Sequence, residues 1–112
     1  MSSESNLEPS ARLAQLSGST RHLLDYVALL PGGALYAVLR HLARVSEEDM
    51  VVDLREAVDA GVLAVMPGRP NAYELPDEAL RALVLEQIGP ERLPKLRARA
   101  EAARRRVEGP EG

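Results

Sequence analysis

The sequence predicts one mostly α-helical domain that carries a small β-hairpin. Most of the chain repeats apolar residues at helical spacing, whereas the stretch 62–75 has β-favouring residues on both sides of a Pro- and Gly-rich turn. A chain of 112 residues, 46% of them hydrophobic, supports one core but not two. We therefore expect a single domain over residues 9–107, between polar, flexible tails at 1–8 and 108–112.

Four helices are expected before the hairpin, at 9–16, 20–30, 34–43 and 47–60. Pro9 suits the first turn of the first helix, because the N–H that proline lacks has no intrahelical partner there. The Ser-Gly-Ser-Thr stretch at 17–20 separates it from the second helix and supplies hydroxyls for the next N-cap. Pro31, Gly32 and Gly33 end the second helix.

The helix predicted at 47–60 has signals at both ends. Ser46 followed by Asp49 forms a capping box, and Gly61 suits the C-terminal cap because glycine adopts the left-handed conformation readily. Its expected buried stripe is Met50, Val51, Leu54, Ala57 and Val58. The carboxylates of this segment, expected on a solvated face, are Glu47, Glu48, Asp49, Asp53, Glu56 and Asp59.

The hairpin is predicted from two short strands, 62–66 and 72–75, joined by a loop of about six residues. Asp77 follows the second strand and is expected to cap a helix over 78–88, rather than to act as a catalytic or metal-binding carboxylate. A last helix is expected at 91–107, with Pro94 in its first turn, where proline is tolerated.

The last helix is strongly basic. It holds half of the 14 basic residues of the chain: Arg92, Lys95, Arg97, Arg99, Arg104, Arg105 and Arg106. No aromatic residue lies among them for base stacking, so specific single-strand recognition is not expected. Its apolar stripe, Leu93, Leu96, Ala100 and Ala103, predicts packing on the domain or on a following repeat, or docking on a partner helix.

Residue types exclude most catalytic chemistry. The chain has no cysteine, and its two histidines, His22 and His41, lie on different predicted helices without a nucleophile motif. We expect both to be surface residues and the protein to be no enzyme, with no metal and no cofactor. The N-terminus lacks a signal peptide and no apolar run is long enough to span a membrane, which predicts a cytoplasmic protein.

Three helices followed by a hairpin describe a winged helix-turn-helix, here with extra flanking helices. The helix at 47–60 takes the position of the recognition helix, and the hairpin is the wing. A recognition helix must approach phosphates, and the carboxylates of this segment oppose that approach. Contacts with protein are therefore favoured over DNA reading.

Short motifs along the chain occur in a distinctive order. They are Leu16-Ser17, Arg21-His22-Leu23-Leu24, Leu29-Leu30-Pro31-Gly32, Ser46-Glu47-Glu48-Asp49, Ala60-Gly61-Val62-Leu63, Tyr73-Glu74-Leu75, Ala79-Leu80-Arg81 and Pro90-Glu91-Arg92. In this order and spacing, over residues 16–103, the chain resembles the winged-helix domain that follows the ATPase core of STAND-type signalling ATPases, which include the large LuxR-type transcriptional regulators.

The resemblance implies a relay module that packs on a nucleotide-binding core and passes its state to downstream helical repeats, without hydrolysing nucleotide itself. The family often carries a phosphate-sensing His after a Tyr-x-Phe strand, and that position is Asp77 here. A carboxylate repels phosphate, so nucleotide sensing is not expected from this position.

Two functions follow as expectations. The first is a non-enzymatic relay or interaction module that contacts a protein partner or neighbouring domains, such as an ATPase core and helical repeats. Its interaction face is expected at Glu47, Glu48, Asp49, Asp53 and Glu56. The alternative is a stand-alone DNA-binding winged helix that uses Arg69 in the wing and the basic C-terminal helix. In the first case nucleic acid would bind only weakly and without sequence preference.

Overall fold

The computed structural model describes residues 9–30 and 32–108. The flexible tails predicted at 1–8 and 108–112 lie outside these residues, except that residue 108 ends the last helix. The elements in order are α1 (Pro9–Ala14), α2 (Gly18–Ala28), β1 (Ala34–Leu35), α3 (Tyr36–Ala43), α4 (Glu47–Asp59), β2 (Ala64–Met66), β3 (Arg69–Glu74), α5 (Glu78–Ile88) and α6 (Leu93–Glu108). A mostly helical fold with a small antiparallel sheet is therefore confirmed.

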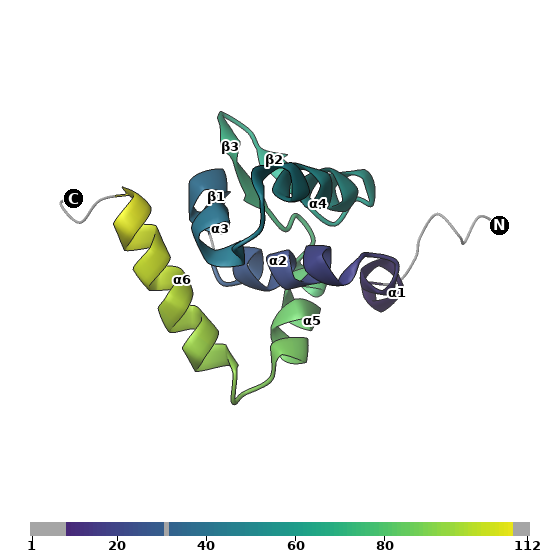
Figure 1. Cartoon of the computed structure of the whole chain (residues 1–112). Helices are drawn as coiled ribbons and strands as arrows, with labels where there is room; N and C mark the ends of the chain where they lie inside the picture. The colour runs from purple at the N-terminus through teal and green to yellow at the C-terminus, as the bar shows by residue number, and fades with distance from the viewer. Residues whose placement is uncertain (1–8, 31, 109–112) are drawn as a thin grey trace.

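Helix α2 lies across the middle of the molecule, and the other elements pack around it (Figure 1). It contacts α3 and α4 on the side of the hairpin and α5 on the other side, while α6 runs along one end of the domain. The reason lies in its sequence, because apolar residues occupy almost every position of its second half. Leu23, Leu24, Tyr26, Val27 and Ala28 are all buried, so α2 has several packing faces instead of one stripe.

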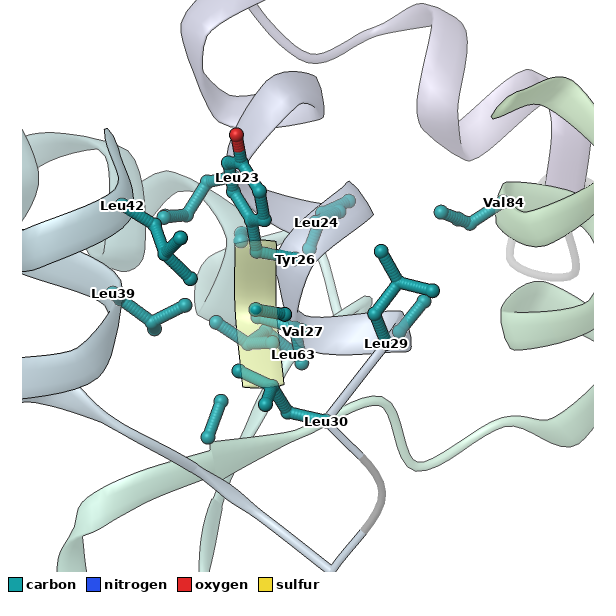
Figure 2. Packing of buried hydrophobic residues seen from close by; sticks show 14 of the residues in the cluster. Leu23, Leu24, Tyr26, Val27, Leu29, Leu30, Leu39, Leu42, Leu63 and Val84 are labelled. Atoms are coloured by element: carbon teal, nitrogen blue, oxygen red, sulfur yellow. The ribbon is translucent and has the colours of Figure 1, made fainter. Parts of the chain in front are cut away.

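The core forms around these residues of α2. Figure 2 shows Leu23, Leu24 and Val27 together with side chains from α3 and from the segment before β2. The ring of Tyr26 is buried with them, and its hydroxyl points out of the cluster. Apart from Tyr26, Met50 and Ile88, the buried cluster consists of leucine, valine and alanine, in a chain that has no Phe and no Trp.

The sheet has one strand more than the sequence predicted. Residues Ala34 and Leu35, expected at the start of a helix, form β1 and pair with Tyr73 and Ala72 of β3, which gives the strand order β1-β3-β2. Just before β1, Gly33 has a φ of +112°, and a Cβ at this position would collide with the side chain of Met66. Glycine is therefore required where the chain enters the sheet.

The hairpin loop is shorter than predicted. Met66 pairs with Arg69, so the loop is Pro67-Gly68 and not the expected six or so residues. Proline fixes its own φ, and Gly68 adopts a φ of +78° at no steric cost, so two residues are enough to reverse the chain. Strand β3 begins at Arg69 as a result, three residues earlier than the sequence indicated.

Helix α4 begins and ends close to the predicted residues but is rotated from the predicted orientation. The Ser46 side chain accepts a hydrogen bond from the Asp49 N–H, and Gly61 has a φ of +79°, as both end signals predicted. The buried residues are Met50, Asp53, Leu54 and Ala57, which are spaced at i, i+3, i+4 and i+7. The prediction that Val51 and Val58 are buried was wrong, because they are 49% and 37% exposed.

The basic C-terminal helix packs on its own domain, as one of its predicted alternatives stated. Leu96, Ala100 and Ala103 are buried and Leu93 is partly buried, and α6 contacts α3 and α2. The helix begins at Leu93, two residues later than predicted, with Pro94 in its first turn. The apolar stripe is therefore occupied within the chain.

We predict that Leu54→Ala lowers the free energy of unfolding by about 2–5 kcal/mol, because Leu54 is 5% exposed and its truncation leaves a cavity. Chemical denaturation measures the change. The control is Val52→Ala on the same helix, where the side chain is 62% exposed and a change within about 0.5 kcal/mol is expected. Equal losses in the two variants would mean that α4 presents a different face to the core.

Candidate functional site

Two carboxylates of α4 bind the N-terminus of α2, and we call this set of residues the α2–α4 clasp: Ser17, Ser19, Thr20, Asp53 and Glu56. The Thr20 hydroxyl donates to Glu56 Oε1 at 2.6 Å, and the Ser17 backbone N–H donates to Glu56 Oε2 at 3.0 Å. The Ser19 hydroxyl donates to Asp53 Oδ1 at 3.0 Å. The clasp satisfies polar groups at a helix N-terminus, where negative charge is also favoured by the helix dipole.

The interaction face predicted on α4 was partly wrong, because two of its five carboxylates belong to the α2–α4 clasp. Asp53 is 7% exposed and Glu56 is half-buried, so both carboxylates are used inside the domain instead of lying on a solvated surface. The hydrogen bond from Thr20 and then that from the Ser17 N–H hold the pKa of Glu56 below its ordinary value. Only Glu47, Glu48 and Asp49 of the predicted face are exposed.

An apolar groove lies between α4 and the sheet. Its volume is about 300 Å³, and it is lined by Tyr36, Val51, Leu54, Arg55, Val58, Asp59, Val65 and Tyr73. Three of the five large hydrophobic side chains that the described part of the chain exposes, Val51, Val58 and Val65, border it. The Tyr36 hydroxyl is buried and has no hydrogen-bond partner among the described residues. The groove thus combines exposed apolar surface with one unused polar atom.

A basic groove lies between α2, the end of α3 and α6. Its volume is about 530 Å³, and its lining residues are His22, Tyr26, His41, Leu42, Ala43, Arg44, Arg99, Ala102, Ala103 and Arg106. The two histidines, expected to be unrelated surface residues, are both exposed and border the same hollow. Among the residues that the structure describes, no carboxylate lines it. This groove was not predicted from the sequence, although Arg99 and Arg106, seven positions apart, share one face of α6.

The other predicted basic contacts are spread over several surfaces. Arg92 borders a separate hollow with Asp25, whose pKa is raised by burial and partly lowered again by His22, Arg92 and Arg21. Arg69 is exposed on the hairpin and donates to the Gly32 carbonyl at 3.4 Å. The remaining predicted contacts on α6 are Lys95, Arg97 and Arg105, which are exposed, and Arg104, which pairs with Glu101 at 3.8 Å.

Asp77 is the N-cap of α5, as predicted. Its carboxylate accepts a hydrogen bond from the Ala79 N–H at 2.9 Å and lies 3.9 Å from the Arg12 guanidinium. Within residues 9–30 and 32–108, no group of three or more His, Asp or Glu side chains is arranged to hold a metal ion. None of the helices described here has both the length and the apolar character that a membrane span needs.

The chain was compared with known families, curated proteins and solved structures. No family model, curated protein or solved structure matches it. The candidate sites are therefore interpreted from their own chemistry.

We predict that Glu56→Gln lowers the free energy of unfolding by about 1 kcal/mol at neutral pH, because it weakens hydrogen bonds to a charged acceptor. The folded-state pKa of Glu56 lies below its ordinary value of 4.5, so its contribution is complete above that value and is lost as the pH falls through the lowered pKa. Denaturation midpoints of both proteins between about pH 7 and pH 3 should converge at the acid end.

Glu48→Gln is the control for this comparison, because Glu48 is exposed in the first turn of α4 and is not part of the clasp. Asp25 acts on stability in the opposite sense to Glu56, since a raised carboxyl pKa favours the folded state as the pH falls. Asp25 is unchanged in every variant, so its effect cancels in the difference. A Glu56→Gln effect that is independent of pH would contradict the account.

Proposed function

We propose that this protein is a non-enzymatic winged-helix interaction module whose α4 surface binds a protein partner with an apolar centre and a basic rim. The order α2, β1, α3, α4 and hairpin supports the winged-helix assignment, since the third helix of this series is followed directly by two antiparallel strands. In this assignment α4 is the recognition helix and the β2–β3 hairpin is the wing.

The observation that carries the proposal is the exposed surface of α4. Its exposed residues are Glu47, Glu48, Asp49, Val51, Val52, Arg55, Val58 and Asp59. Four of these eight are acidic and one is cationic. DNA-reading helices make phosphate contacts with cations and amide side chains before they reach bases, and this surface has almost none. Exposed valines beside carboxylates are instead the chemistry of a protein contact.

The residues of the apolar groove indicate which side chains a partner would need in order to bind there. Its valines favour an apolar side chain, and the acidic first turn of α4 favours Lys or Arg on the rim of the partner. The resemblance to winged-helix domains beside an ATPase core supports a neighbouring domain of a signalling protein as this partner.

A peptide selection tests the partner chemistry. We predict that panning a random peptide library enriches sequences that combine apolar residues with Lys or Arg, and that their binding shifts the amide signals of Val51, Val58 and Val65. Val58→Ser together with Val65→Ser should weaken binding about tenfold or more, because each change removes apolar burial.

The matched control in this selection is Val107→Ser, which changes an exposed valine on α6, remote from α4 in the sequence and not part of the apolar groove. It should leave the affinity unchanged. Acidic peptides as the enriched class, or equal losses in the groove variant and the control, would contradict the proposal.

A duplex titration separates the proposal from the alternative of a DNA-binding winged helix. We predict only weak, sequence-independent binding at about 150 mM salt, with an affinity that falls steeply as salt rises. Replacing Arg104, Arg105 and Arg106 by Ala should remove most of it, whereas Glu47→Lys with Glu48→Lys should increase it. A nanomolar, sequence-selective complex whose amide shifts map to α4 would establish the DNA-binding alternative instead.

A further inference from the structure

We propose that the basic groove between α2, the end of α3 and α6 binds a small anion that carries two or more linked phosphate groups. This inference is independent of the α4 surface. It rests on the charge of the groove, its shape, and the conformation of one arginine at its edge.

Three arginines and two histidines line the groove. Arg44 comes from the end of α3, and Arg99 and Arg106 come from α6, while His22 and His41 come from α2 and α3. The side chains of these three arginines form no ion pair or hydrogen bond with any other residue in the described part of the chain. Each guanidinium keeps its full set of donors for a ligand, in the planar geometry that suits phosphate oxygens.

Small residues line the groove beside its arginines. Ala102 and Ala103 lie between Arg99 and Arg106 on α6, and Ala43 precedes Arg44. Alanine side chains leave space between α6 and the helices that it crosses, and the longer arginines can reach over this space from its borders. The volume of about 530 Å³ lies within the usual range of small-molecule sites.

Two features hold the walls in place before a ligand arrives. The His22 ring packs edge-on against the buried ring of Tyr26, with centroids 5.3 Å apart and an interplanar angle of 81°. Helix α6 is fixed on the domain by the buried side chains of Leu96, Ala100 and Ala103. The helices that carry the arginines are therefore fixed in advance, and binding has to order only the arginine side chains.

The backbone conformation of Arg44 indicates that an arginine side chain is needed at this position for a reason other than the fold. It has a φ of +58°, the left-handed conformation at the C-cap of α3. Glycine is preferred at left-handed positions after helices, and a residue with a Cβ is less stable there. The arginine therefore occupies a position where glycine would make the fold more stable, and Arg44 also lines the basic groove.

The number of charges indicates the ligand class. A single phosphate carries at most two negative charges near neutral pH and is small compared with a groove of about 530 Å³. A diphosphate or longer phosphate chain places oxygens near several guanidinium groups at once. The shared chemistry is a linked phosphate chain, which free pyrophosphate and a nucleoside diphosphate both supply.

The test is a titration of the full chain with sodium pyrophosphate at constant ionic strength and without metal, followed by amide and imidazole NMR signals. We expect saturable binding that shifts His22 and His41, with pyrophosphate bound more tightly than orthophosphate. Arg99→Ala should weaken binding about tenfold, the usual effect of losing a hydrogen bond between two charged groups. Arg97→Ala, on the same helix but outside the groove, should change it less than twofold.

Arg44→Gly is the most informative variant. It should weaken pyrophosphate binding about tenfold while leaving the domain at least as stable as the parent, because glycine suits a positive φ. ADP without magnesium serves as a second probe: binding tighter than that of pyrophosphate assigns the site to a nucleoside diphosphate, and equal binding assigns it to the phosphate chain alone. Absence of saturation, equal losses in Arg97→Ala and Arg99→Ala, or displacement of pyrophosphate by a DNA duplex at lower concentration would overturn the proposal.

Discussion

Two carboxylates on α4 hold the N-terminus of α2, and the orientation of α4 depends on this contact. Thr20 and the backbone N–H of Ser17 both donate to Glu56, while Asp53 is 7% exposed beside them. The face that carries Asp53 must turn inward for these bonds to form. Val51 and Val58, which would otherwise be expected in the core, turn outward as a consequence. A polar contact thus determines which apolar residues α4 exposes.

The two grooves lie on different parts of the fold and differ in chemistry. The apolar groove is formed by α4 and the sheet, and the basic groove by α2, α3 and α6. Helix α2 connects them, since it contacts both α4 and α6 (Figure 1). The proposed ligand in one groove and the proposed partner in the other would therefore both contact elements that pack on the same central helix.

Local signals predicted the elements well, and contacts between distant residues account for the errors. Ser46, Gly61 and Asp77 define helix ends through hydrogen bonds or backbone conformations that involve only near neighbours. Strand β1 was missed because two residues cannot show an alternating pattern and their partners lie in β3. The inward position of Asp53 and the shared groove of His22 and His41 depend on how whole helices pack, which no local pattern encodes.

A double-mutant cycle between Thr20 and Glu56 tests the central claim most directly, since the claim is that this contact positions α4. Denaturation of Thr20→Val, Glu56→Gln and the double variant gives the coupling free energy of the pair. The account predicts that the double variant loses about 0.5–1 kcal/mol less than the sum of the two single losses, because both single variants weaken the same hydrogen bond. It also predicts amide shift changes at Val51 and Val58 in each single variant. Additive losses with unchanged α4 signals would contradict it.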